Sequence, residues 1–163
     1  MAPVLRLIGK WNKLKDEKSI RTISTFKNKI RGNLSTGSNF NTTSKLKLSR
    51  KHETVLNKIR CDLFFKSQKF SHNFTDTDDN LCACGKPETP KHVFFSCERH
   101  NLQRQQLMTT LEQKNHLIDH LPRTNQDKLE FFLFGNNLSI DEDTTLKESV
   151  IKFILSLNIF NVH

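Results

Sequence analysis

The chain has few residues of the kinds that define several large protein classes. No apolar run reaches 18 residues, so the sequence pattern predicts no membrane-spanning helix. Four Cys and five Gly in 163 residues are too few for a disulfide-rich scaffold or a collagen-like chain. Apolar residues make up 35% of the chain, and even with glycine added this is below the roughly 45–50% usual in globular proteins. A packed core is therefore expected in only part of the chain.

Positive charge is concentrated in the front half. Residues 1–70 hold 17 basic and 4 acidic side chains, a net charge of +13, whereas residues 71–163 hold 9 basic and 13 acidic ones, a net charge of −4. Such asymmetry favours a polyanionic partner for the front half, either nucleic acid or an anionic membrane. A solvated basic segment with no dedicated partner is the plain alternative.

The first residues do not resemble a secretory signal. Over residues 1–15, apolar side chains fall at helical spacing among basic ones. This pattern is shared by a mitochondrial presequence, a membrane-surface helix and an ordinary amphipathic helix, of which we favour the last. Without a signal we expect a nuclear or cytoplasmic protein, not a secreted one, with reduced cysteines.

The pattern of the remaining chain predicts a mainly α-helical fold. We expect a small irregular helical domain with one zinc-stapled loop and a basic, partly disordered N-terminal arm. Residues 33–44 have the Ser, Thr, Asn and Gly content of a linker. They divide the chain into an arm and linker at 1–44 and a helical domain at 45–163, with a zinc-binding segment at 81–100.

Local signals mark where the helices of this domain begin and end. Ser49 is expected to cap a helix that runs to about Lys66, and Thr89 with Pro90 is expected to start another helix. The residues from Thr124 onward form a Phe-rich helix that Gly135 can end.

The last helix has the clearest periodicity. Thr145 and Glu148 are expected to form a capping box at its start. A continuous apolar stripe follows at the spacing of one helix face. Its members are Leu146, Val150, Phe153, Ile154 and Leu157.

Three of the four cysteines cluster around one histidine. Cys82, Cys84, His92 and Cys97 follow the pattern C-x-C-x7-H-x4-C. Three thiolates and an imidazole are a complete tetrahedral set for one structural Zn²⁺, with no open position for catalysis. The alternative is that the cysteines are small buried apolar residues. His100 is a weaker candidate ligand than His92, and Cys61 is expected to be a buried helical thiol.

The cysteine segment resembles a known family. Residues 81–97 resemble the C-terminal zinc-binding segment of non-LTR (LINE-type) retrotransposon reverse transcriptases, with its pattern C-x-C-G…E-T…H…C. Gly85, Glu88 and Thr89 match that pattern as well as the four ligands. The looser resemblance spans roughly residues 45–160. It implies a fragment or domesticated remnant of the retrotransposon polyprotein that binds zinc and contacts RNA or DNA.

The basic residues of the front half are the candidate phosphate contacts. They are Lys27, Lys29, Arg31, Lys45, Lys47, Arg50, Lys51, Lys58 and Arg60. Phe94 and Phe95 are candidates for base stacking, although packing beneath the zinc loop is the favoured interpretation.

No polymerase or RNase H site is expected in this chain. Asp76, Asp78 and Asp79 offer the carboxylates that two-metal catalysis uses, but their polar surroundings indicate a solvated acidic loop, so we expect no enzymatic activity. A second hypothesis is a zinc-stapled helical module that binds other proteins, or the parent polyprotein, through exposed Phe131, Phe132 and Phe134 and the last stripe. A third is a membrane-surface protein that uses residues 1–15.

Overall fold

The computed structural model describes residues 41, 43–135 and 137–159. The expected mainly α-helical fold is confirmed in these ranges, which contain no β-strand beyond one isolated antiparallel bridge between Leu81 and Pro87. The elements, in chain order, are the 3₁₀ turn η1 (Thr43–Lys45), the helices α3 (Arg50–Arg60) and α4 (Lys66–Ser71), the π-helical turn η2 (His92–Ser96), the 3₁₀ turn η3 (Glu98–His100), and the helices α5 (Asn101–Glu112), α6 (Asn115–Ile118), α7 (Asn125–Phe134) and α8 (Ile140–Ser156).

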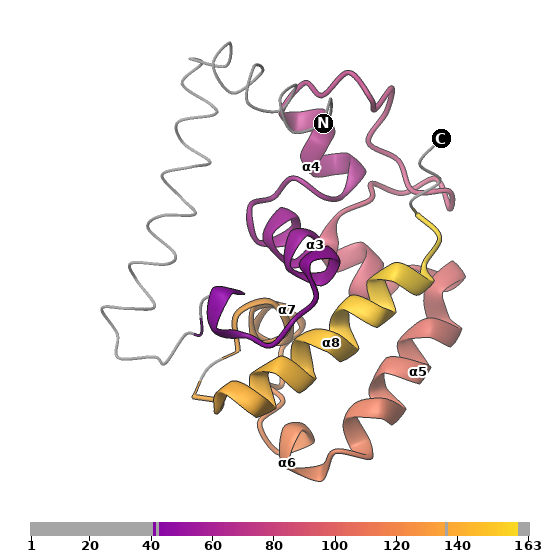
Figure 1. Ribbon diagram of the computed structural model, residues 1–163. Helices are drawn as coiled ribbons and strands as arrows, with labels where there is room; N and C mark the ends of the chain where they lie inside the picture. Colours follow the sequence, from indigo (N-terminus) through magenta and orange to yellow (C-terminus); the bar gives the residue numbers. More distant parts are fainter. Residues whose placement is uncertain (1–40, 42, 136, 160–163) are drawn as a thin grey trace.

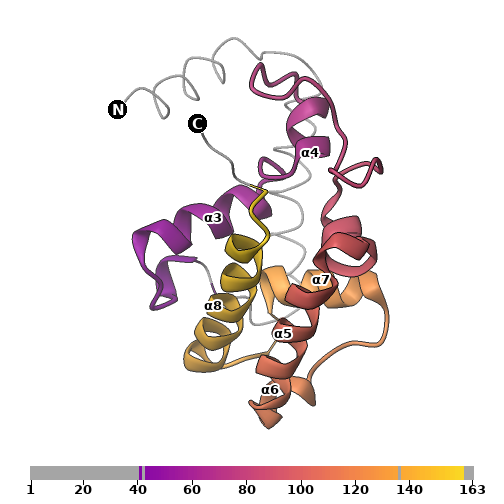
Figure 2. The same cartoon turned by 90° about the vertical axis from the view of Figure 1, so that its right-hand side faces the viewer.

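Helix α8 is the element against which the other long helices pack. It lies between α3 and α5, and α7 also packs against it (Figures 1 and 2). The predicted apolar stripe explains this position, because Leu146, Val150 and Ile154 are fully buried. None of the described helices is long and apolar enough to cross a bilayer.

Phenylalanine rings fill much of the core. Phe94 lies among four of them, with centroid distances of 5.2 Å to Phe153, 5.9 Å to Phe132, 6.1 Å to Phe95 and 6.5 Å to Phe65. Core packing, rather than base stacking, is therefore the role of the Phe94 ring. Because Phe94 lies in the chain between the candidate ligands His92 and Cys97, its packing joins the cysteine segment to the helical core.

The exposed docking surface expected on α7 is not present. Phe131, Phe132 and Phe134 are only 2–3% exposed. Burial of these large rings stabilises the packing of α7 against α8 and α3, since apolar area removed from water is the main favourable contribution to folding. The expectation that they form a protein-binding surface is therefore wrong.

The helix expected from Ser49 to about Lys66 is broken into two. Ser49 does cap α3, accepting from the backbone N–H of His52 at 3.3 Å. The helix ends at Arg60, and Asp62 has a left-handed backbone with φ of 56°. A second helix, α4, begins only after Phe65, so the chain turns between the two.

The last helix starts six residues, or about 1.7 turns, earlier than expected. Its capping box is formed by Ser139 and Glu142, whereas the box expected at residues 145–148 lies inside the helix. Both sites fit the same four-residue pattern. The helix begins at the earlier one, and the turn that this adds contains the buried Asp143 and Thr144. The Thr124 cap and the end of α7 at Gly135, whose φ is 58°, agree with the sequence-based prediction.

Most of the expected arm, including Lys27, Lys29 and Arg31, lies outside the described residues. At its end, Asn41 Nδ2 donates to the backbone oxygen of Leu138 at 3.2 Å. Thr43 Oγ1 donates to Asn57 Oδ1 on α3 at 2.7 Å. These contacts attach the last residues before position 45 to the helical domain.

Candidate metal centre

A short hairpin presents the first two cysteines. Its arms are joined by hydrogen bonds from Glu88 N to Asn80 O at 2.8 Å and from Cys82 N to Lys86 O at 2.7 Å. The turn between them needs a left-handed residue, which Gly85 provides with φ of 83° and without a steric cost. Cys82 is thereby placed under the hairpin and Cys84 at its exposed tip.

The other two ligands lie at the ends of a π-helical turn. The backbone N–H of Cys97 donates to His92 O at 2.8 Å, which closes a turn with one residue more than an α-helix has. In a regular α-helix a spacing of five residues covers about 1.4 turns and points two side chains to different faces. The wider turn brings both residues toward the hairpin, in keeping with the frequent use of π-helical turns at functional sites.

The four side chains converge on one point. Their ligand atoms all lie within 4.8 Å of one another. Cys82 Sγ is 3.7 Å from Cys97 Sγ, and Cys84 Sγ is 3.1 Å from His92 Nε2. Two sulfurs on a tetrahedral Zn²⁺ are about 3.8 Å apart when each Zn–S bond is about 2.3 Å. Cys82, Cys84, His92 and Cys97 therefore lie close enough to hold one metal ion, as the sequence predicted.

The surroundings of the cluster shift the pKa values of its side chains in different directions. A hydrogen bond from the backbone of Lys86 lowers the pKa of the exposed Cys84 thiol. Burial raises the pKa of Cys82 to about 11. Burial, with the nearby positive charges of Lys86 and Arg104, lowers the pKa of His92 and favours the neutral imidazole that a metal requires.

Two residues outside the ligand set, Arg104 and Glu88, support the cluster. The guanidinium of Arg104 on α5 donates to Cys97 O at 2.5 Å and to Val93 O at 3.3 Å, so it holds the end of the π-helical turn. Glu88 is 5% exposed and accepts from the backbone N–H of Lys66 at 3.0 Å, which ties the hairpin to the first turn of α4. An arginine three residues into a helix carries no signal of such a role.

The two other thiol and imidazole candidates lie outside the cluster. His100 is buried but is not among the converging ligands. Cys61 is half-buried at the end of α3, and burial raises the pKa of its thiol. His92, and not His100, is the imidazole that lies with the three thiols.

Comparisons with known proteins add no relative. No protein-family model, no curated protein and no solved structure matches this chain.

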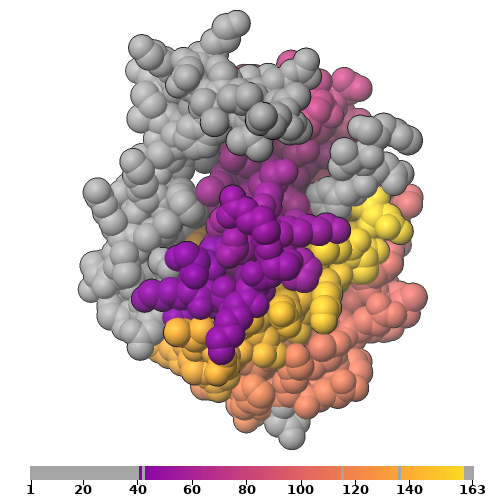
Figure 3. Space-filling model, in the orientation of Figure 1, coloured from indigo at the N-terminus to yellow at the C-terminus, as the bar shows by residue number. Residues whose placement is uncertain are grey.

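Five of the predicted phosphate contacts are exposed on one described stretch, η1 to α3, which faces the viewer in Figure 3. They are Lys45, Lys47, Arg50, Lys51 and Lys58. Lys47 pairs with Asp141 at 2.7 Å and Arg50 pairs with Glu53 at 3.2 Å. Lys51 and Lys58 are seven residues apart, so they lie on the same side of α3 two turns from each other.

Arg60 has to be removed from this set. It is 5% exposed, and its Nε donates to the backbone oxygen of Leu133 at 2.7 Å. Its guanidinium also lies 5.4 Å from the ring centroid of Phe134. The arginine stabilises the C-terminal end of α7, where backbone oxygens carry partial negative charge, and is not available to a phosphate at the surface.

The acidic loop makes ordinary surface contacts. Asp76 pairs with Lys69 at 3.2 Å and Asp79 pairs with Lys66 at 3.6 Å. Asp79 Oδ1 also accepts from the backbone N–H of Leu81 at 2.8 Å, which fixes the entry to the hairpin. These bonds attach the loop to α4 and to the metal-binding segment.

Proposed function

We propose that the chain is a zinc-binding, non-catalytic nucleic-acid-binding segment related to the C-terminal part of non-LTR retrotransposon reverse transcriptases. One observation carries the proposal: four residues in the order C-x-C-G…H…C converge with donor atoms within 4.8 Å. The resemblance of residues 81–97 to that family supplies the functional context.

Zinc is the metal that suits this donor set best. Three thiolates and one imidazole in a closed tetrahedral arrangement are typical of structural Zn²⁺ sites, whereas Mg²⁺ and Ca²⁺ prefer oxygen ligands. A bound Zn²⁺ would add a cross-link between the hairpin and the π-helical turn. Three thiolates and one Zn²⁺ would leave the site with a net charge of −1, which the nearby Lys86 and Arg104 would offset.

Contact with nucleic acid rests on the exposed cations of η1 and α3. Phosphate neutralisation by lysine and arginine needs only surface positive charge and supplies most of the non-specific affinity. Lys51 and Lys58 lie on the same side of α3 and make no ion pair among the described residues. A binding role, rather than polymerisation, is favoured because Asp76 and Asp79 pair with lysines on the surface.

Elemental analysis tests the metal. Protein purified without chelator should carry about one zinc per chain. Cys84→Ser should lower this content strongly, whereas Cys61→Ser, a matched change outside the cluster, should leave it unchanged. Zinc-free protein after refolding with zinc present would refute the proposal, and a different metal at full occupancy would correct its identity.

The salt dependence of binding tests the nucleic-acid surface. A labelled 12-nucleotide single-stranded RNA is titrated into the full chain over a range of salt concentrations. Each neutralised phosphate on a single strand contributes a slope of about 0.7 in log affinity against log salt. Replacing Lys51 and Lys58 together by Gln should lower that slope by roughly 1.4, whereas Arg123→Gln, between α6 and α7, should leave it unchanged. No binding at low salt, or no effect of the double change, would refute this surface.

A further inference from the structure

One exposed amide on α3 is held by a chain of hydrogen bonds that starts in the core. The side chain of Asn57 is exposed, and its Oδ1 accepts from Thr43 Oγ1 at 2.7 Å. Thr43 Oγ1 in turn accepts from Arg60 Nη1 at 2.9 Å. Arg60 is buried, and its Nε donates to Leu133 O at 2.7 Å. The surface amide is therefore anchored, through two side chains, to the C-terminal end of α7.

The direction of these bonds decides which groups of the amide are left for a partner. A guanidinium can only donate, so Thr43 Oγ1 accepts from Arg60 and gives its own proton to Asn57. The amide atom next to Thr43 is accordingly the acceptor Oδ1. In the part of the chain that the structure describes, Nδ2 of Asn57 donates to no group. Asn57 therefore offers a partner the two N–H donors of Nδ2 and the second lone pair of Oδ1.

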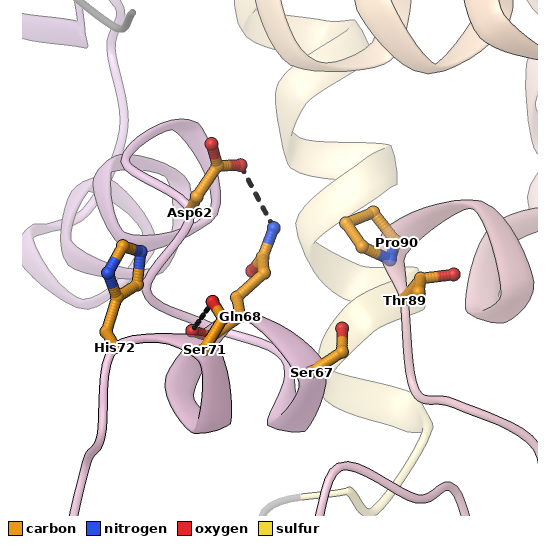
Figure 4. A pocket seen from close by; sticks show the side chains of 7 residues that line it. All are labelled: Asp62, Ser67, Gln68, Ser71, His72, Thr89 and Pro90. Atoms are coloured by element: carbon orange, nitrogen blue, oxygen red, sulfur yellow. Dashed lines mark hydrogen bonds between the residues drawn. The ribbon is translucent and has the colours of Figure 1, made fainter. Parts of the chain in front are cut away.

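The amide that lines the polar hollow beside α4 differs in this respect (Figure 4). Gln68 Oε1 accepts from the backbone N–H groups of Phe64 and Phe65 at 3.2 and 3.1 Å. Its Nε2 donates to Asp62 Oδ1 at 3.0 Å. Both ends of that amide serve the turn between α3 and α4, whereas Asn57 uses only one end of its amide within the chain.

Two exposed cations lie beside Asn57 on the outer face of α3. Lys51 and Lys58 are about 10.5 Å apart along the helix axis, on the same side of it. Thr54 is three residues from Lys51 and three from Asn57, so it lies between them on the helix surface. A phosphate backbone that is held by the two lysines would bring a base edge to the amide, because phosphate contacts set the register in which bases are read.

The composition of α3 favours a DNA duplex over a single strand. Proteins that bind single strands stack the bases on aromatic side chains, and α3 contains no Phe, Tyr or Trp. The major groove of B-DNA is about 12 Å wide and admits an α-helix. The major groove of A-form RNA is too deep and narrow for side chains to read.

We propose that the outer face of α3 enters the major groove of duplex DNA, where Asn57 reads one adenine. This inference rests on the proposed nucleic-acid binding and names its substrate as a duplex. An asparagine amide matches adenine, because Nδ2 donates to the ring N7 and Oδ1 accepts from the N6 amine. Guanine presents only the acceptors O6 and N7 in this groove, so Oδ1 has no partner there. The bond from Thr43 orients the amide before the base arrives, which reduces the freedom that is lost on binding.

Paired duplexes test the site. Fluorescence anisotropy compares a labelled 12-bp DNA of mixed G·C sequence with the same DNA carrying one central A·T pair. Wild type should bind the A·T duplex roughly fivefold more tightly, at the lower end of the about 5- to 150-fold that a bidentate contact provides, because the other registers of the duplex compete for the protein. Asn57→Ala should remove the preference and keep the affinity for the G·C duplex. Gln105→Ala, which deletes an exposed amide on α5, should keep the preference.

The hydrogen-bond chain has a test of its own. Thr43→Val removes the hydroxyl that orients Asn57 and should remove most of the preference, with the affinity for the G·C duplex unchanged. Thr110→Val makes the same change on α5, where Thr110 Oγ1 donates to Gln106 O at 2.7 Å, and should have no effect. An unchanged preference in Thr43→Val would refute the orienting role of Thr43.

The outcomes separate this inference from the function beneath it. Equal binding of the two duplexes by wild type, or binding of single-stranded RNA but not of duplex DNA, overturns the inference and leaves nucleic-acid binding intact. No binding of either kind of nucleic acid overturns both. A preference that survives Asn57→Ala would mean that another residue reads the base. Replacing Lys51 and Lys58 together by Gln should weaken both duplexes equally, because phosphate contacts carry no sequence information; a loss confined to the A·T duplex would contradict the assigned roles.

Discussion

Removal of the Phe94 ring should damage the core and the metal site together. Phe94 is 2% exposed, contacts four other rings and stands between the ligands His92 and Cys97. Truncation of a buried Phe to Ala costs about 3–5 kcal/mol. The four ring contacts favour the upper half of that range, because aromatic pairs add to the burial term.

The loss can be measured by urea unfolding followed by circular dichroism. For a chain of this size a slope of about 2 kcal/mol per molar urea is expected. Phe94→Ala should therefore lower the midpoint by roughly 2 M, a large part of the about 5–15 kcal/mol that stabilises an ordinary domain. Phe131→Ala is the matched control, since this ring is also buried, at 3% exposed, but lies on α7 with its ring contact to Phe132 on the same helix.

Zinc affinity separates the two variants. Chelator competition is measured without urea, at a temperature at which both variants remain folded. Phe94→Ala should lower zinc affinity by about 10- to 100-fold, the usual effect of disturbing groups that orient ligands. Phe131→Ala should lose much less than tenfold. Equal losses would mean that the metal senses only global stability, and an unchanged midpoint for Phe94→Ala would refute the central place of this ring in the core.

Three further changes test supporting interactions. Arg104→Ala should lower zinc affinity by about 10- to 100-fold in chelator competition, and Arg104→Lys, which cannot span Val93 O and Cys97 O together, should recover only part of it. Burial raises the pKa of Glu88, so the folded state loses stability as the pH rises from the ordinary pKa of a glutamate to the raised one. Glu88→Gln should therefore unfold at a higher urea concentration than wild type at pH 7 but not at pH 4. Burial lowers the pKa of Lys147 to about 8, so between about pH 8 and 10.5 the unfolded chain binds one proton more than the folded chain. The stability of the wild type relative to Lys147→Met should therefore rise with pH across that window. A stability difference that does not change with pH would refute the lowered pKa.

The ligand set could be predicted from the sequence because its chemistry is local. Thiolates and an imidazole within 16 residues have few structural uses other than a metal, and Gly85 marks the turn that the hairpin needs. The apolar stripe of α8 was predictable for a related reason, since side-chain periodicity alone decides which face is buried. The Thr124 cap and the Gly135 end also depend only on neighbouring residues.

Other features depend on contacts that are distant in the sequence. The charge of Arg60 predicted a surface role, but its burial depends on Leu133 O, which lies 73 residues away. The capping box was predicted at residues 145–148, but Ser139 and Glu142 fit the same pattern, and the turn that they add contains the buried Asp143 and Thr144. The break at Asp62 has no strong local signal, since aspartate adopts the left-handed conformation only occasionally.

Glu88 joins the metal segment to α4. Its side chain accepts from Lys66 N, and its backbone oxygen accepts from Ser67 Oγ at 2.7 Å, so the first turn of α4 is bonded directly to the end of the cysteine hairpin. One residue later, Thr89 Oγ1 accepts from the backbone N–H of the ligand His92 at 3.0 Å. Helix α4 and the start of the π-helical turn are therefore both attached to the end of the cysteine hairpin. It follows that metal loss should disturb the position of α4 before it weakens binding to phosphate, because in the described part of the chain the exposed lysines of α3 make no hydrogen bond or ion pair with the hairpin.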